Sequence, residues 1–231
     1  MKTHNFSAGP CILPDEVFKK ASDAILDFDN SLSLIEISHR STPFVNVMNK
    51  CISLVKELLN VPKGYSVLFL QGGASLQFLM VPFNLMKLNG SAAYLNTGTW
   101  STKAINEAKL FGNTIVVGDS SDKNFNYIPK NYLVPENIDY FHCTSNNTIY
   151  GTQYHYVPKT NVPLICDMSS DFISRPIDVA PYDLIYAGAQ KNAGPSGVTI
   201  LIINKRISRN FDGAPTVPKI MRYETQAKKD S

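Results

Sequence analysis

Long hydrophobic runs, clustered charge and paired cysteines are all scarce in this chain of 231 residues. No stretch approaches the roughly 18 to 20 uninterrupted apolar residues that a membrane span needs, so no transmembrane helix is predicted. Charged residues make up only 18% and the net charge is +3, without the Lys and Arg cluster typical of a nucleic-acid surface. Hydrophobic residues make up 44%, which excludes a disordered chain. No apolar run follows the first residues, so no secretory signal is predicted.

Cysteine and histidine spacing argues against two further kinds of site. None of the four cysteines stands at C-x-x-C spacing, which favours reduced, mostly buried thiols in a cytoplasmic protein. They are Cys11, Cys51, Cys143 and Cys166. The four histidines show no metal-ligand spacing, so no metal site is expected.

Apolar residues alternate between helical and strand periods along the chain. Helices are predicted from residue 15, from residue 43, over 76–88 and over 101–111. Strands are predicted at 65–70, 92–95, 114–117, 140–141, 162–166, 184–186 and 198–203. This alternation predicts an α/β fold around a mostly parallel sheet, with ligands bound at the carboxyl ends of the strands.

Small residues follow the first predicted strand, in Gly72-Gly73-Ala74-Ser75. They would let a phosphate approach the backbone, and the free amides of the next helix favour an anion there. The alternative is an ordinary tight turn between strand and helix, since this is neither a P-loop nor a G-x-G-x-x-G motif.

Two other predicted strands end next to chemically capable side chains. Asp167 directly follows an apolar strand and could pair with a cationic ring nitrogen, or could simply cap the residues after it. Lys191 lies among small residues, which leaves room for a bulky adduct on its amine. It could equally be a solvent-facing lysine in a glycine-rich loop. Together, a phosphate cradle, an acid and a lysine are what a protein contributes to pyridoxal phosphate (PLP) chemistry.

Motifs along nearly the whole chain strengthen this interpretation. The sequence resembles phosphoserine aminotransferases, a group of class-V, fold type I PLP enzymes. The resemblance is carried by residues 5–10, 36–41 (Glu-Ile-Ser-His-Arg-Ser), 71–73, 174–178 (Ser-Arg-Pro-Ile-Asp) and 185–197 (Ile-Tyr-Ala-Gly-Ala-Gln-Lys-Asn-Ala-Gly-Pro-Ser-Gly). It implies a three-layer αβα large domain with a mixed, mostly parallel sheet.

The resemblance also implies roles for individual residues. Lys191 would bind PLP covalently and Asp167 would pair with its ring nitrogen. Trp100, otherwise read as a core residue, would stack on the ring, and Thr148 would hydrogen-bond near it. The phosphate would be held by Ala74, Ser75 and Gln190. His39 and Arg40, otherwise a surface pair, would bind the anionic side chain of the substrate.

The implied reaction is amino transfer from L-glutamate to 3-phosphohydroxypyruvate, giving O-phospho-L-serine and 2-oxoglutarate. Some bacterial members also act in vitamin B6 synthesis. The resemblance further implies a cytoplasmic homodimer with shared active sites. We expect residues 1–14 to form an N-terminal arm on the small-domain side and residues 15–231 to form the PLP-binding large domain. The sequence ends before the family's Asn-Thr-Pro-Pro motif and small C-terminal domain, so we expect this chain to be weakly active or inactive.

Three other interpretations stay open from the sequence. One is a non-catalytic fragment that binds PLP or a partner subunit. A second is a sister aminotransferase or a cysteine desulfurase, although no cysteine stands in an obvious mobile loop. The third is a plain nucleotide-binding α/β domain, which lacks its fingerprint here.

Overall fold

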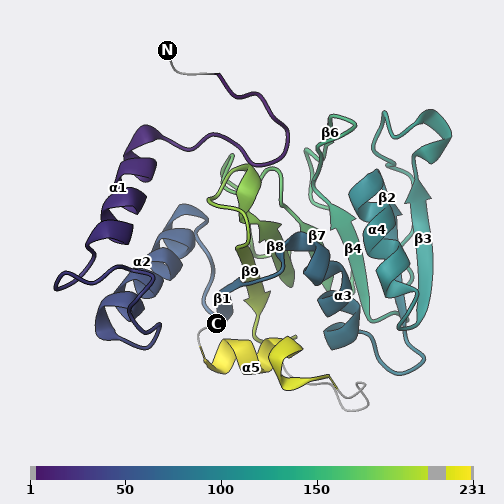
Figure 1. Cartoon of the computed structure of the whole chain (residues 1–231). Coiled ribbons are helices and arrows are strands. Elements are labelled where there is room, and N and C mark those ends of the chain that lie inside the picture. The colour runs from purple at the N-terminus through teal and green to yellow at the C-terminus, as the bar shows by residue number, and fades with distance from the viewer. Residues whose placement is uncertain (1–3, 208–216, 230–231) are drawn as a thin grey trace.

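A seven-stranded sheet forms the centre of the computed structural model, which describes residues 4–207 and 217–229 (Figure 1). The strand order is β1-β9-β8-β7-β4-β2-β3, and β9 runs antiparallel to its neighbours β1 and β8 while the other pairs are parallel. The strands are β1 (Tyr65–Leu70), β2 (Ser91–Asn96), β3 (Asn113–Asp119), β4 (Tyr140–Thr144), β7 (Leu164–Asp167), β8 (Leu184–Gly188) and β9 (Thr199–Asn204). The predicted mixed, mostly parallel sheet is therefore confirmed.

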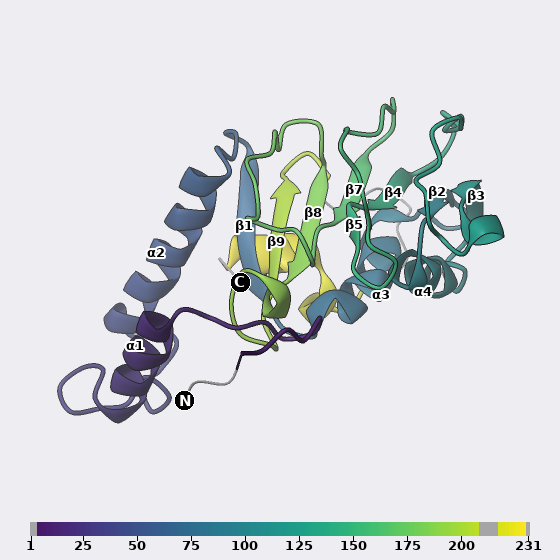
Figure 2. The same ribbon diagram turned by 90° about the horizontal axis from the view of Figure 1, so that it is seen from above.

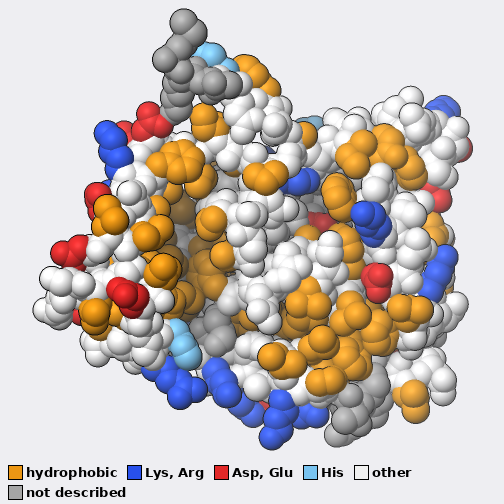
Figure 3. Space-filling view, viewed as in Figure 1, with side chains coloured by type: hydrophobic (Ala, Val, Ile, Leu, Met, Phe, Trp, Pro, Cys, Tyr) orange, Lys and Arg blue, Asp and Glu red, His pale blue; other side chains and the backbone are white. Residues whose placement is uncertain are grey.

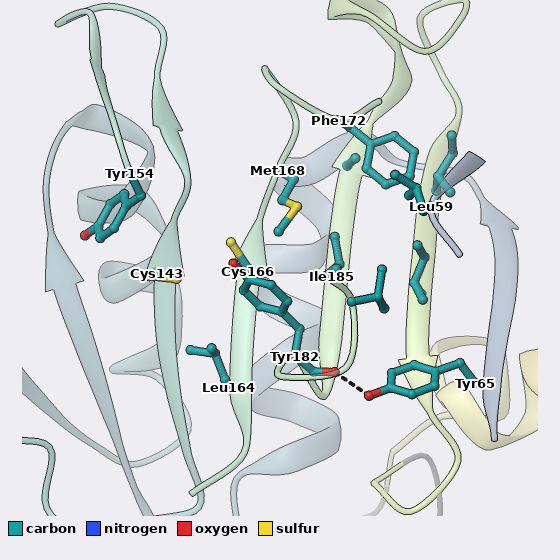
Figure 4. Packing of buried hydrophobic residues seen from close by; sticks show 14 of the residues in the cluster. Leu59, Tyr65, Cys143, Tyr154, Leu164, Cys166, Met168, Phe172, Tyr182 and Ile185 are labelled. Carbon is teal, nitrogen blue, oxygen red and sulfur yellow. Dashed lines mark hydrogen bonds between the residues drawn. The ribbon is translucent and has the colours of Figure 1, made fainter. Parts of the chain in front are cut away.

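Helices and irregular segments cover the sheet on its two faces (Figure 2). On one face lie α3 (Gly73–Leu85), α4 (Thr99–Ala108) and the short α5 (Tyr223–Lys228), which pack on side chains such as Tyr94, Ile165 and Leu201. On the other face lie the end of α2 (Thr42–Leu58) and irregular segments that contribute Tyr154, Phe172 and Tyr182 (Figure 4). The three predicted layers are present, although only one outer layer consists mainly of helices.

Burial on both faces explains why the central strands are continuous apolar runs. In β7, Leu164 and Cys166 point to one core and Ile165 points to the other, and all three are at most 1% exposed. A parallel strand between two covered faces needs no polar alternation. The strand predicted at 65–70 has the observed bounds of β1, and the other predicted strands each overlap an observed one.

The apolar side chains of the first two helices remain largely uncovered. α1 (Asp15–Leu26) begins where predicted but buries none of its residues, and Val17 and Ile25 are 44% and 50% exposed. Of the residues of α2, only Val55 is buried. A helical period therefore identified both helices correctly, whereas the contacts that would cover them are absent among the described residues.

Several short elements were not predicted. They are the hairpin β5 (Asn146–Asn147) and β6 (Thr152–Gln153), the 3-10 turns η1 (Ser121–Lys123), η2 (Ala189–Lys191) and η3 (Lys219–Met221), and α5. Parts of the predicted arm (1–14) and of the predicted large domain (15–231) lie outside the described residues, namely 1–3, 208–216 and 230–231.

Membrane, metal and disulfide features were searched in residues 4–207 and 217–229. No helix there is both long and apolar enough to cross a bilayer, and no group of three His, Cys, Asp or Glu side chains could hold a metal ion. All four cysteines are free; Cys143 and Cys166 are buried, whereas Cys11 and Cys51 are half-buried.

Candidate active site

Two adjoining cavities lie at the carboxyl ends of the parallel strands. Their volumes are about 530 Å³ and about 140 Å³, and both are lined by Gly73, Trp100, Gln190 and Lys191. The loops that follow β1, β2, β4, β7 and β8 all begin at this edge, so residues far apart in sequence meet here. This is the place that the fold makes available for a ligand.

Lys191 ends the turn η2, directly after β8. Its Nζ donates a hydrogen bond to the Thr148 hydroxyl and lies 5.4 Å from the centre of the Trp100 ring. Burial lowers the pKa of Lys191, and the nearby carboxylate of Asp167 offsets part of that shift. A lowered pKa raises the fraction of neutral amine, which is the nucleophilic form.

Asp167 is the last residue of β7 and is only 3% exposed. Burial raises the pKa of Asp167, while hydrogen bonds from Ser169 and the charge of Lys191 lower it. The Ser169 backbone N–H (2.9 Å) and hydroxyl (2.6 Å) both donate to Asp167 Oδ1. The cap that the sequence offered as one alternative is therefore present, and pairing with a cationic ring nitrogen stays a prediction.

Ser169 was missed from the sequence, although it supports the acid directly. Besides donating to Asp167, its hydroxyl accepts a hydrogen bond from the Gly188 N–H at 3.0 Å, so it joins the ends of β7 and β8. The signal that could have identified it is a serine two residues after a strand-end aspartate, which is typical of a side chain-to-backbone turn.

The start of α3 forms the predicted cradle. Gly72 and Gly73 have φ angles of +90° and +65°, which an L side chain rarely adopts, and a Cβ on Gly72 would lie 2.4 Å from Leu76. The first N–H groups of a helix lack intrahelical acceptors, and Ala74 and Ser75 at this position line the smaller cavity. Backbone donors and a positive helix end therefore face the cavity, as an anion requires.

Two buried polar atoms beside the cavities have no partner among the described residues. They are Trp100 Nε1 and Thr144 Oγ1. Trp100 lines both cavities and Thr144 lines the smaller one. Buried polar atoms are normally hydrogen-bonded, so unpartnered ones at a cavity wall indicate a site built for a polar occupant.

The segment before α1 crosses this site as an extended arm (Figure 2). Ala8, Gly9 and Pro10 line the larger cavity, and the Cys11 N–H donates to the Gln190 carbonyl at 2.9 Å. An arm over residues 1–14 was predicted, and its described part covers the loop that carries Lys191. Its assignment to a separate domain stays a prediction.

His39 and Arg40 lie elsewhere. Both are exposed and line a third cavity of about 1430 Å³, together with apolar residues of α2 such as Met48 and Ile52. Figure 3 shows orange side chains along a hollow on this side of the molecule. Neither residue lines the cavities at Lys191 within this chain, so their role in substrate binding stays a prediction.

Comparison with known proteins identifies the family of this chain. A model of the class-V aminotransferase family matches residues 3–226, and the chain belongs to that family. It is 58% identical to a phosphoserine aminotransferase of Flavobacterium johnsoniae and 53% identical to that of Parabacteroides distasonis, over the whole chain in both cases. It spans about 65% and 64% of the lengths of those two curated relatives.

Solved structures agree with this family. The phosphoserine aminotransferase of Bacillus circulans subsp. alkalophilus superimposes with a TM-score of 0.92 at 43% identity, over 97% of this chain and 63% of its own. A PLP-bound phosphoserine aminotransferase from Trichomonas vaginalis gives a TM-score of 0.91 at 34% identity, over 99% of this chain and 65% of its own. The fold type inferred from the sequence motifs is therefore confirmed.

Proposed function

We propose that this chain supplies the PLP-binding part of an enzyme that transfers the amino group of L-glutamate to 3-phosphohydroxypyruvate, forming O-phospho-L-serine and 2-oxoglutarate. One observation carries the proposal. The amine of Lys191, with its lowered pKa, lies between the Trp100 ring and the Thr148 hydroxyl in a cavity that Asp167 also bounds. The names of the curated relatives point to the same reaction.

The residues at this site fit PLP group by group. Lys191 would bind its aldehyde carbon, and Asp167 would hold the proton on its ring nitrogen. The start of α3 and Gln190 would bind its phosphate. Trp100 would stack on its ring. Bound there, PLP supplies an electron sink for the charge that develops at the α-carbon of an amino acid.

The proton at the α-carbon must then be moved by a side chain of the protein. Lys191 is the nearest candidate, because its amine bounds both cavities and burial favours the neutral, basic form. The Thr148 hydroxyl accepts a hydrogen bond from this amine and so orients it. The N-terminal arm at Ala8–Pro10 would limit the entry of water from one side.

Binding of the substrate anions is the weakest part of the described site. No arginine among the described residues lines either cavity at Lys191, although carboxylates and phosphates are commonly held by bidentate arginine. We therefore propose that the 231-residue chain binds PLP but transaminates slowly on its own. Each missing charge-assisted hydrogen bond would cost about 1.5 to 3 kcal/mol.

Assembly would address part of this deficit. We propose a homodimer in which His39 and Arg40 of one copy serve the site of the other, because they do not reach Lys191 in their own chain. The half-exposed apolar side chains of α1 would be available for such a contact. The four free cysteines are compatible with the cytoplasm, where we place the enzyme.

A desulfurase is the less supported alternative. Such an enzyme needs a reactive thiolate at the coenzyme, and no described cysteine lines the cavities at Lys191. Cys166, although next to Asp167 in sequence, is buried, and burial raises the pKa of its thiol. A raised pKa keeps the thiol protonated and unreactive.

The test is the absorbance spectrum of the purified chain with PLP, followed by borohydride reduction and peptide mapping. We expect a yellow adduct that reduction fixes on Lys191, and a Lys191→Ala variant that forms none. Adding O-phospho-L-serine should bleach the adduct slowly, whereas L-cysteine should release no sulfide. An adduct on other lysines, or sulfide release, would refute the proposal.

A further inference from the structure

We infer that Asp171 is a positioning residue, whose carboxylate holds both ends of the hairpin that carries Thr148 against Lys191. The effect of Asp171 on PLP affinity rests on the proposed function, whereas its effect on the hairpin does not.

The two oxygens of Asp171 are occupied by opposite ends of this hairpin. The Ser145 hydroxyl, just before β5, donates to Oδ1 at 2.5 Å. The Gln153 amide, in β6, donates to Oδ2 at 3.1 Å. Asp171 is only 8% exposed, and its hydrogen bond with Ser145 is buried while that with Gln153 is partly buried. A single carboxylate therefore joins the chain on both sides of Thr148.

Arg175 adds a third attachment from the Ser-Arg-Pro-Ile-Asp stretch that the sequence singled out. Its Nη2 donates to the Tyr154 carbonyl at 3.2 Å and lies 3.8 Å from Asp171 Oδ2. The Ser174 hydroxyl donates to the Asp171 carbonyl at 2.7 Å, which fixes the turn itself. Ser174 and Arg175 of this motif therefore hold the hairpin and the turn in place without lining the cavities.

The hairpin needs these attachments because it is too small to hold its own shape. Its two strands have only two residues each, and an isolated two-stranded hairpin is marginal in water even when longer. Thr148 lies between those strands. The Ser145 backbone N–H donates to the Asp167 carbonyl at 2.9 Å, so the same residue links the hairpin to the strand end that carries the acid.

An Asp171→Asn variant tests this arrangement. An amide can still accept from Ser145, but its NH2 group would face the donors of Gln153 and Arg175. Asp183→Asn is the matched control, because Asp183 is also buried and accepts from an arginine, Arg206, at 2.6 Å. It lies just before β8, at the other end of the strands from the cavities.

Two readouts separate a positioning role from a general loss of stability. The first is amide hydrogen exchange of residues 146–153 without coenzyme, and the second is the dissociation constant for PLP. With Asp171→Asn, we expect the exchange rate of these amides and the dissociation constant for PLP each to rise by about tenfold, the change expected when a charge-assisted hydrogen bond is removed. Ser145→Ala should give a smaller rise in both, and Asp183→Asn should change neither in the folded protein.

Each other outcome has a defined meaning. Unchanged exchange in 146–153, or an equal rise along the whole chain, would overturn the inference. Faster exchange there with unchanged PLP affinity would also overturn it, because the hairpin would then not position the site. If Asp171→Asn does not fold, Ser145→Ala decides by the same criteria. If the unaltered chain binds no PLP, the proposed function fails and the exchange data alone decide the role of Asp171.

Discussion

Replacing Tyr223 by phenylalanine should destabilise the fold by about 1 to 3 kcal/mol, although it removes only one hydroxyl. Tyr223 begins α5 and is 1% exposed. Its hydroxyl donates to Gln77 Oε1 at 2.8 Å, and Gln77, in α3, is fully buried. Phenylalanine would leave that buried oxygen without a donor, which costs its full desolvation penalty.

Asn84 attaches the backbone of α5 to α3 independently of the Tyr223 hydroxyl. Its amide donates to the Met221 carbonyl at 2.8 Å and its Oδ1 accepts from the Tyr223 N–H at 3.0 Å. These backbone contacts survive in Tyr223→Phe, so the helix should stay docked and the change should report the hydroxyl alone. Tyr223→Ala would add a large cavity and should cost about 3 to 5 kcal/mol, by analogy with other buried aromatic residues.

Urea and thermal unfolding measure this effect. A domain of this length shifts its midpoint by about 2 to 4 °C for each kcal/mol. Tyr127→Phe is the control, since the Tyr127 hydroxyl bonds Asp122 at the surface, and it should leave the midpoint unchanged. In a double-mutant cycle, Gln77→Leu combined with Tyr223→Phe should be less destabilising than the sum of the two. A Tyr223→Phe midpoint equal to wild type, or strictly additive effects, would refute the reasoning.

Four further outcomes are expected. Burial raises the pKa of Asp167, so its stabilising effect is present at low pH and lost as pH rises through that pKa. Asp167→Asn should therefore raise the free energy of unfolding at pH 7 while weakening PLP binding, as urea unfolding and PLP titration would show. Lys191 should react with amine reagents at lower pH than surface lysines, because burial lowers its pKa; peptide mapping measures this. The fluorescence of Trp100, the only tryptophan, should fall when PLP is added. Burial lowers the pKa of His142 to about 3, so the folded protein does not protonate it between pH 7.5 and pH 5, whereas the unfolded chain does. The free energy of unfolding should therefore fall by about 2 kcal/mol over this range, and this fall should be absent in His142→Phe.

The seven strands of the main sheet were predictable because each contains a short apolar run between turn residues. Tyr65–Leu70 follows Gly64 and precedes Gln71-Gly72, and its observed bounds are the predicted ones. Such a run needs no tertiary information, because the sheet is covered on both faces. Even in β1, at the edge of the sheet, Val67 and Leu68 are buried in opposite cores. The strand ends were then predictable too, and so were Asp167 and Lys191 as residues at one edge.

The α5 helix could not be predicted in the same way. It has only six residues, and the tail around it is polar. A helix this short is not stable by propensity, so it depends on its contacts with α3. Those contacts join Tyr223 to residues 139 and 146 positions earlier, Asn84 and Gln77. No local pattern contains such a pairing.

His39 and Arg40 show the corresponding limit for the site. A motif indicates that two residues belong to a function, but it does not indicate which cavity they reach. His39 and Arg40, in the turn before α2, line the third cavity and not those at Lys191. The reason is that α2 lies on the opposite side of the molecule from α4 (Figure 1). Their spacing in sequence carries no information on that distance.

The supports of the site follow a different rule from the groups that line it. Asp167 ends a strand, and Lys191 and Trp100 come shortly after one, so a strand prediction locates them. Ser169 lines the smaller cavity and also holds the acid, and only its place after a strand-end aspartate could identify it. Asp171 lines neither cavity and is identified only by the hairpin that it holds, which carries Thr148. Since these charge-assisted hydrogen bonds attach residues next to Lys191, loosening one should change the geometry at Lys191. Among substitutions that never touch the cavities, those in residues 171–175 should therefore alter PLP affinity most.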